Sequence, residues 1–408
     1  MHKRYTGIFI AGLFLLLSCL PVIAAEDEEF ALEKETYDVL SSARELMQEE
    51  AYNRAVEKIE KLLTKDIKPY DRAVACQTLG YIFISMDDYP SAIDSLRRSL
   101  DGEYLPDDVI HQINLNMAQL LIQQSRFSEG IDYLERWFQN ETNPDKQSFL
   151  LAASAYYQME AYEKMIPMAQ KALAASDKPD QSLYEMLLAG YFHSGNYRQA
   201  AVTLEDMIKL FPGKDEYWLQ LAASYQQLEN YKKALAIYEI ALTKGILDKD
   251  HILQLAQLYL NQSLPYKAGK LLDEQMQKGV LDDSIDNLEI LANSWLLARE
   301  YDKAVSALKK LAGRKNDPQI YYRIGRISYE QENWEEAIEA LEHAVNNNIK
   351  DNVAESYLLL GIAAYNANNN TLSSRALTEA SSHDRTREQA RWWLKKLARR
   401  MSEQSGNS

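Results

Sequence analysis

The sequence predicts an all-α protein made of about ten helix-turn-helix repeats stacked into a solenoid. The first observation is a period of 34 residues, because the segment WLQLA at 218–222 is followed by ILQLA at 252–256. A second pair, KGILD at 244–248 and KGVLD at 278–282, has the same offset. Composition agrees, since 15 glycines and 10 prolines in 408 residues favour helices over strands. Periods of about 20–50 residues are typical of solenoids, whose stacked repeats share one apolar core.

The segment 215–248 shows why each repeat should contain two helices. Its apolar residues form two stripes, each on one face of a helix. The stripes are Trp218, Leu221, Ala222 and Tyr225, and then Ala234, Tyr238 and Ala241. The polar stretch 226–230 lies between them and is expected to be a turn. Ala222 and Ala234 are small residues at the positions where we expect the two helix backbones to come close.

These seven positions resemble the tetratricopeptide repeat (TPR), which has large, Leu, small and Tyr residues at this spacing in its first helix. The resemblance implies a right-handed α-α superhelix, the TPR solenoid. Carried along the chain, it gives the repeats 36–69, 73–106, 111–144, 146–179, 181–214, 215–248, 249–282, 285–317, 318–351 and 354–387. The third repeat departs from the pattern, because Trp137 stands where a small residue is usual. The extra residues 70–72 and 107–110 are the expected positions of a slight hinge.

Residues 1–25 have the organisation of a signal peptide, so the chain is expected in the periplasm. Lys3 and Arg4 form a basic start, and the apolar run Ile8–Leu20 is too short to span a bilayer comfortably. Small residues offer a cleavage site at Ala24 or Ala25. The alternative is a lipoprotein signal, because Leu16–Cys19 resembles a lipobox ending at Cys19. An uncleaved anchor is the third interpretation.

Two segments flank the predicted solenoid. Residues 26–35 form an acidic lead-in, and residues 388–402 form a basic capping helix that covers the open end of the repeats. Thr386 and Gln389 fit a capping box at the start of this helix. Its predicted apolar stripe is Ala390, Trp393, Leu394, Leu397 and Met401. Trp392 falls off the stripe, so we expect it to be exposed to a partner or an anionic lipid surface. Residues 403–408 are expected to be a disordered tail.

Charge and motifs exclude several classes of function. The net charge of −15 disfavours nucleic-acid binding. The six histidines form no compact pair of metal ligands, and no catalytic or phosphate-binding motif is present. We therefore expect no metal, no cofactor, no catalytic residues and no enzymatic activity. Cys76 is expected to be a buried, unreactive residue.

The resemblance also implies a binding surface, because TPR proteins line their concave face with residues of the first helix. The candidate partner-binding residues are Tyr81, Tyr157, Phe192, Gln227, Asn261, Tyr322, Arg326, Tyr329 and Tyr365. Aromatic and amide side chains suit a peptide or a helix held in a groove. Cations are scarce on this face, where the firm ones are Arg44 and Arg326. A carboxylate would lose its water there without gaining a cation, so a neutral or basic, partly apolar ligand is expected.

These features predict a non-enzymatic periplasmic scaffold or adaptor that binds a protein partner, with membrane contact limited to the periphery. The signal peptide, the repeats and the final Ala390-x-x-Trp393 helix resemble periplasmic TPR proteins that accompany TonB energy-transduction systems. That resemblance implies a role beside the TonB–ExbB–ExbD machinery in outer-membrane transport. The alternative is an outer-membrane-tethered lipoprotein that assists assembly of pili or outer-membrane proteins, which requires lipidation of Cys19. A third class, the TPR half of an enzyme such as a periplasmic protease, lacks a catalytic domain here.

Overall fold

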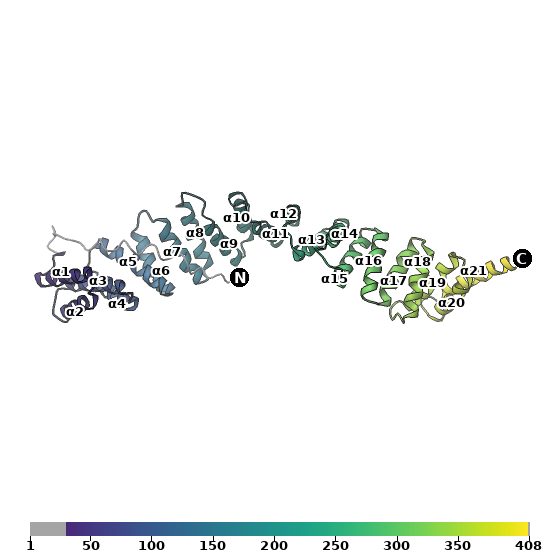
Figure 1. Ribbon diagram of the computed structural model, residues 1–408, viewed down its shortest axis with the longest axis horizontal. Coiled ribbons are helices and arrows are strands. Elements are labelled where there is room, and N and C mark those ends of the chain that lie inside the picture. The colour runs from purple at the N-terminus through teal and green to yellow at the C-terminus, as the bar shows by residue number, and fades with distance from the viewer. Residues whose placement is uncertain (1–29, 407–408) are drawn as a thin grey trace. The chain divides into compact units, whose positions relative to one another are not determined.

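Residues 30–406 are described by a computed structural model, and their regular secondary structure is helical, which confirms the all-α solenoid (Figure 1). Twenty of the helices pair into ten hairpins. The hairpins are α1–α2 (Lys34–Gln48, Tyr52–Leu63), α3–α4 (Pro69–Ser85, Tyr89–Ser99), α5–α6 (Asp107–Gln123, Phe127–Asn140), α7–α8 (Lys146–Gln158, Tyr162–Ala174), α9–α10 (Gln181–His193, Tyr197–Leu210), α11–α12 (Glu216–Gln227, Tyr231–Lys244), α13–α14 (Lys249–Asn261, Pro265–Gln277), α15–α16 (Ile285–Leu297, Tyr301–Arg314), α17–α18 (Pro318–Glu330, Trp334–Asn346) and α19–α20 (Val353–Asn366, Asn370–Ser382). A final helix, α21, spans Arg387–Gly406. The proposed signal peptide lies outside the described residues.

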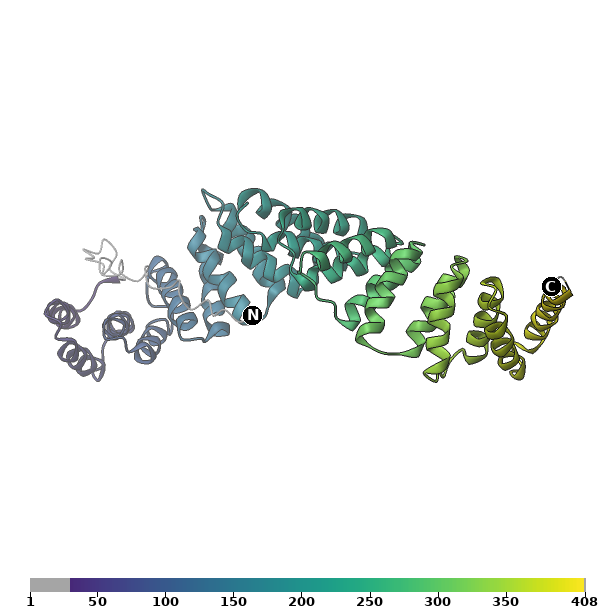
Figure 2. The same cartoon turned by 45° about the vertical axis from the view of Figure 1, so that its right-hand side comes forward.

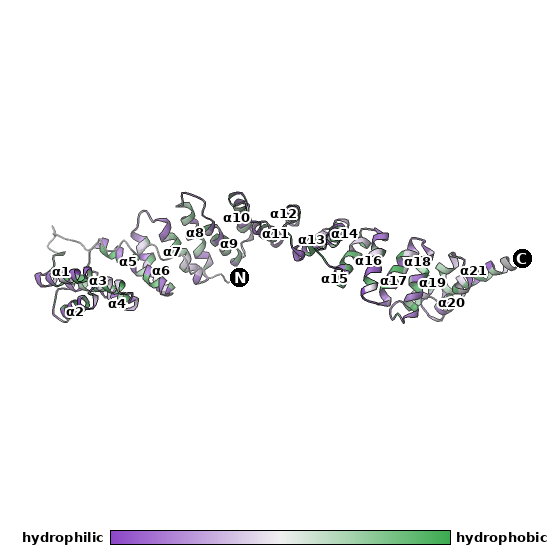
Figure 3. Ribbon diagram, in the orientation of Figure 1, coloured by the Kyte–Doolittle hydropathy of each residue, from purple (hydrophilic) through white to green (hydrophobic). Residues whose placement is uncertain are grey.

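The chain divides into two compact units, with the boundary between Thr203 and Leu204 inside α10. In the C-terminal unit, consecutive hairpins lie side by side and α21 follows α20 (Figures 1 and 2). Green, apolar segments alternate with purple, polar ones along the helices (Figure 3), as expected for helices that bury one face. No helix among residues 30–406 combines the length and the apolar character that crossing a membrane requires.

Each hairpin turn contains one residue in the left-handed backbone conformation. These residues are Glu50, Asp87, Ser125, Glu160, Gly195, Glu229, Ser263, Arg299, Glu332 and Asn368. In the sixth hairpin, the Asn230 N–H donates to the Tyr225 carbonyl at 2.9 Å, five residues back, and ends α11. The Asn230 side chain then accepts from the Lys233 N–H and begins α12. The short turn therefore ends one helix and starts the next within a few residues.

Small residues allow the two helices of a hairpin to come close. A Cβ atom built on Gly325 of α17 would lie 2.5 Å from Leu341 Cγ of α18, closer than atoms can pack. A Cβ on Gly361 of α19 would meet Leu377 of α20 at 2.6 Å. Ala222 stands at the position in the sixth hairpin that corresponds to Gly325, and it and Ala234 are both completely buried.

The residues expected to form a hinge are helical. Residues 70–72 belong to the first turn of α3 and residues 107–110 to the first turn of α5, and each of these helices has 17 residues. Asp71 is completely buried and accepts the backbone N–H of Glu33 at 3.0 Å, which ties the lead-in to α3. The extra residues therefore lengthen a helix instead of loosening a joint. Cys76 of α3 is buried, as predicted, and burial raises the pKa of its thiol.

Helix α21 packs on the last hairpin, as the sequence predicts. Ala390 and Leu397 are buried, and Ala390 shares an apolar cluster with Leu377 and Ala380 of α20. Two expectations are wrong. Met401 is 47% exposed, so the buried stripe ends at Leu397. The helix also continues to Gly406, into the segment expected to be disordered.

We predict opposite effects for two Gly→Ala substitutions in the C-terminal unit. Gly325→Ala should lower the free energy of unfolding by about 1 kcal/mol or more, because overpacking costs about 1–3 kcal/mol and exceeds the gain in helix propensity. Gly313 of α16 is the matched control, since a Cβ there meets nothing within 4 Å. Gly313→Ala should therefore stabilise the protein, by up to about 1 kcal/mol. Urea denaturation measures both, and an unchanged Gly325→Ala midpoint would contradict the close-packing argument.

Candidate partner-binding surfaces

Tyrosine–glutamate hydrogen bonds join successive hairpins. The hydroxyl of Tyr156 on α7 donates to Glu135 on α6 at 2.9 Å, and Tyr259 on α13 donates to Glu239 on α12 at 2.7 Å. A lysine lies over each of these rings, at 5.7 Å for Lys164 and 5.5 Å for Lys267. In the same way, the Tyr225 hydroxyl donates to Glu205, and Lys233 lies over the Tyr225 ring. Each joint between these hairpins thus combines a charged hydrogen bond with a cation–π contact.

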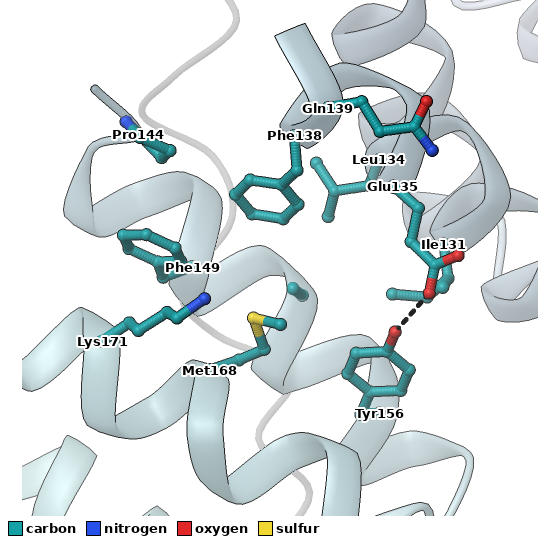
Figure 4. Close-up of a pocket in the computed structure, with 11 residues that line it drawn as sticks. Ile131, Leu134, Glu135, Phe138, Gln139, Pro144, Phe149, Tyr156, Met168 and Lys171 are labelled. Atoms are coloured by element: carbon teal, nitrogen blue, oxygen red, sulfur yellow. Dashed lines mark hydrogen bonds between the residues drawn. The ribbon is translucent and has the colours of Figure 1, made fainter. Parts of the chain in front are cut away.

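Beside the first of these bonds lies an open, mostly apolar crevice of about 530 Å³ in the N-terminal unit. We call it the α6–α8 crevice, and its lining is Ile131, Leu134, Glu135, Phe138, Gln139, Pro144, Phe149, Ala152, Tyr156, Met168 and Lys171. The rings of Phe138 and Phe149 stack on each other in its wall, with centroids 5.5 Å apart and planes at 16° (Figure 4). Figure 4 also shows the Tyr156–Glu135 hydrogen bond at one end and Lys171 beside Phe149 at the other.

Local sequence explains why the crevice forms at this joint. Helix α6 ends at Asn140, and α7 starts at Lys146 after Asp145, whose side chain accepts the Ser148 N–H at 2.8 Å. The connection between these helices contains Pro144, which borders the crevice. The Trp137 ring, at the position where small residues are usual, stacks on His111 at 5.4 Å. Trp137 therefore packs back on α5 and leaves Phe138 to line the crevice.

The two ends of the crevice carry opposite charges, the Glu135 carboxylate at one end and the Lys171 ammonium at the other. Burial and the hydrogen bond to the Glu135 carboxylate raise the pKa of Tyr156 to about 12, so its hydroxyl keeps its proton at neutral pH. The ammonium of Lys171 lies 5.5 Å from the Phe149 ring centroid. No described residue forms an ion pair with Lys171 within 4.0 Å. A ligand in the crevice would meet apolar walls with an acceptor, Glu135, at one end and a cation at the other.

The predicted first-helix residues of the N-terminal unit are partly exposed and touch other aromatic or polar groups. The Tyr81 hydroxyl on α3 accepts from Asn116 on α5 at 3.1 Å. Tyr157 contacts Tyr162 at 6.0 Å, and Tyr162 stacks on His193 of the next hairpin at 4.4 Å and 5°. The structure therefore joins Tyr157 to an aromatic cluster that crosses between two hairpins. Sequence register alone did not identify Tyr162, because it belongs to a second helix.

Phe192, the remaining predicted aromatic residue of this unit, lies near Tyr197 at 6.2 Å. In the C-terminal unit, Tyr329 contacts Trp334 at 5.6 Å in the same way, across the turn of its hairpin. These aromatic residues are half-buried, since each packs on the first residue of the following helix. They present a part of each ring rather than a whole ring to solvent.

Gln227, Asn261 and Arg326 are exposed, as the predicted binding role requires. Asn261 accepts from Gln257 at 2.9 Å, and Arg326 lies 3.8 Å from Glu330 on its own helix. Trp392 is 58% exposed, which confirms its predicted exposure.

One predicted contact residue is corrected by the structure. Tyr322 is 4% exposed and packs with Leu341 and Ile349 in a core cluster, so its side chain is not available to a partner. Tyr365 is half-buried and packs against α21, where the Arg400 guanidinium lies 3.7 Å from its ring centroid and Lys396 lies 5.2 Å away. Helical register places both on the expected face, but neighbouring elements bury Tyr322 and leave Tyr365 partly exposed.

The Tyr156–Glu135 contact should make stability depend on alkaline pH. Because the pKa of Tyr156 is raised in the folded state, its contribution is complete below about pH 10 and is lost as pH rises through about 12. The loss of stability on going from about pH 9 to about pH 11.5 should therefore be smaller for Tyr156→Phe than for the unchanged protein. Urea denaturation across this range measures it, with the exposed Tyr104→Phe as control. Equal pH dependence for Tyr156→Phe and the unchanged protein would contradict the assignment.

Comparison with known proteins finds one family model that is similar to two segments of the chain. A family model described as "Anaphase-promoting complex, cyclosome, subunit 3" matches residues 158–241 and 279–344. The match covers less than half of the chain, so it is a similarity over these hairpins. No curated protein sequence matches this chain at a significant level.

Solved TPR structures resemble the fold at low sequence identity. A tetratricopeptide repeat protein from Parabacteroides merdae is 15% identical, with a TM-score of 0.34 over 64% of this chain and 99% of that chain. YrrB, described as a TPR protein with an unusual peptide-binding site, is 15% identical, with a TM-score of 0.34 over 46% and 92% of the two chains. The TPR2AB domain of yeast Sti1, in a complex with pHSP90, is 15% identical, with a TM-score of 0.35 over 62% and 96% of the two chains.

The period of 34 residues, the hairpin in every repeat and the small residues at the helix contacts occur together along the described chain. Together they define one type of repeat, and they are observed in this chain itself, independently of any similar structure. The described chain therefore has the fold of a helical-hairpin solenoid of the tetratricopeptide repeat type.

Proposed function

We propose that this chain is a non-enzymatic scaffold that holds a protein partner, with the α6–α8 crevice as an anchoring point. The observation that carries the proposal is the apolar lining of the crevice, where Phe138 and Phe149 remain partly exposed to solvent. Apolar surface of this kind gains free energy when a partner covers it. A large apolar side chain from a peptide or a helix suits the apolar surface beside the two stacked rings.

The first-helix face contributes a second, more polar contact region. Gln227, Asn261 and Arg326 can donate to and accept from the backbone of a bound segment. The acidic residues of this face are Glu185, Glu216, Asp250, Asp286, Glu289 and Glu355. They favour a neutral or basic segment over one that ends in an acidic group.

We place this scaffold in the periplasm, on the basis of the signal-peptide pattern in residues 1–25. The narrower proposal is a role beside a TonB–ExbB–ExbD system, which rests on the Ala390-x-x-Trp393 helix. Ala390 is buried and Trp393 packs on Tyr365, so these two residues already have a packing role. Crosslinking in the envelope with TonB and ExbD as probes tests the narrower proposal. Recovery of neither protein would remove it while leaving the scaffold proposal in place.

The alternative is a lipoprotein that assists assembly in the outer membrane, which the segment ending at Cys19 supports. Intact mass of the exported chain separates the two. A start near Ala25 or Glu26 supports the soluble periplasmic scaffold, and an acylated Cys19 at the N-terminus supports the lipoprotein.

The crevice prediction uses aromatic truncation. Phe138→Ala and Phe149→Ala together should weaken binding of the captured partner at least tenfold, because aromatic anchors contribute about 1–2 kcal/mol or more each. The partner is first captured from an envelope extract and then titrated against the purified variants by calorimetry.

Phe127→Ala is the matched control, because Phe127 is a half-buried aromatic residue of α6 that does not line the crevice. Circular dichroism checks that all variants keep their helical content. If the partner binds the double variant and the Phe127 variant equally well, the crevice is not the anchoring point.

A further inference from the structure

Helix α21 carries a row of three cations on its outward face. Arg391, Lys395 and Arg399 follow one another at intervals of four residues, and all three are exposed. At 3.6 residues per turn they lie within about 80° of arc, so they share one side of the helix. Among the side chains that the structure describes, none forms an ion pair with any of the three. Like charges at this spacing repel, so the row is unfavourable for the helix by itself.

The other cations of α21 are engaged within the C-terminal unit. The Arg400 guanidinium donates to the Tyr365 carbonyl at 2.7 Å and lies over the Tyr365 ring. Lys396 lies 4.6 Å from the Trp393 ring centroid, and Arg387 pairs with Asp384. These contacts and the buried Leu397 hold the helix with its row of cations facing away from α20. The row is therefore a fixed surface, set in place before any ligand arrives.

An exposed indole lies beside the row. Trp392 is 58% exposed, and helical geometry places it next to Arg399 on the outward face. Its ring meets Trp393 edge-on, at 5.0 Å and 89°, which fixes its orientation. Tryptophan is favoured where one side of the ring meets water and the other meets the acyl boundary of a bilayer.

We propose that this outward face of α21, formed by Arg391, Trp392, Lys395 and Arg399, binds an anionic lipid surface. Charge complementarity favours an anionic surface as the ligand, because residues 384–400 have a net charge of +5 within a chain of net charge −15. A straight row of separate cations matches a surface of many negative headgroups better than it matches one ligand. The exposed indole adds a group suited to the headgroup layer. The acidic remainder of the chain is repelled by such a surface, so attachment is confined to α21.

Vesicle co-sedimentation tests this proposal with the chain from residue 26 onward. This form keeps every described helix and lacks the apolar segment 8–20, which could bind lipid by itself. Binding is expected to phosphatidylcholine vesicles that contain phosphatidylglycerol and not to phosphatidylcholine alone. It should weaken as salt is added, because exposed charges are screened over about 8 Å at physiological ionic strength.

The triple variant Arg391→Gln, Lys395→Gln, Arg399→Gln should bind at least tenfold more weakly, and Trp392→Ala severalfold more weakly. The matched control is Arg54→Gln, Lys58→Gln, Lys61→Gln on α2, which removes three exposed cations from another helix. It should bind like the unchanged chain, although its net charge equals that of the first triple variant. Thermal midpoints should not fall in either variant, because all six side chains are exposed.

Equal binding by the two triple variants would overturn the proposal, as would equal binding to neutral vesicles. Binding to a fluorescent DNA oligonucleotide or a polyglutamate peptide, with none to anionic vesicles, would also overturn it in favour of a macromolecular polyanion. None of these three results bears on the α6–α8 crevice, which belongs to the other unit.

Discussion

The close approach of two helices at one small residue is the contact on which several of the described hairpins depend. At Gly325 and Gly361 there is no room for a Cβ, because leucines of the second helix occupy that space. Ser373 replaces the usual alanine in the last hairpin and remains buried, because its hydroxyl donates to the Gly361 carbonyl at 2.8 Å. A buried hydroxyl without such an acceptor would be costly. Packing at this contact sets the distance between the two helices of a hairpin. A short turn is then long enough to connect them.

Contacts between hairpins are less uniform, and this variation creates the surfaces that matter for function. A tyrosine, a carboxylate and a lysine join several hairpins, as at Tyr156 and Tyr259. The joint between α6 and α7 keeps the tyrosine contact but opens beside it, because Pro144 lies in the connection and Trp137 packs back on His111. The resulting crevice is lined by apolar residues that a continuous core would have covered.

Helix α21 closes the last hairpin and has a different character on each side. Its inner side buries Ala390 and Leu397 and packs Trp393 against Tyr365, which stays half-buried. Its outer side holds the cation row and Trp392. A solenoid needs a cap at its end, and this cap uses its inner side for stability while its outer side remains available.

The sequence by itself determined the all-α repeat, the small residues at the helix contacts, the packing of α21 and the exposure of Trp392, because each follows from spacing along a single helix. Tertiary structure alone decided which of the residues on the first-helix face remain accessible to solvent. Tyr322 and Tyr329 share a helical face, yet neighbouring hairpins bury the first and leave part of the second exposed. The crevice was equally invisible in the sequence, since its walls come from three helices. Periodicity reports the direction in which a side chain points, whereas accessibility depends on what the next hairpin places there.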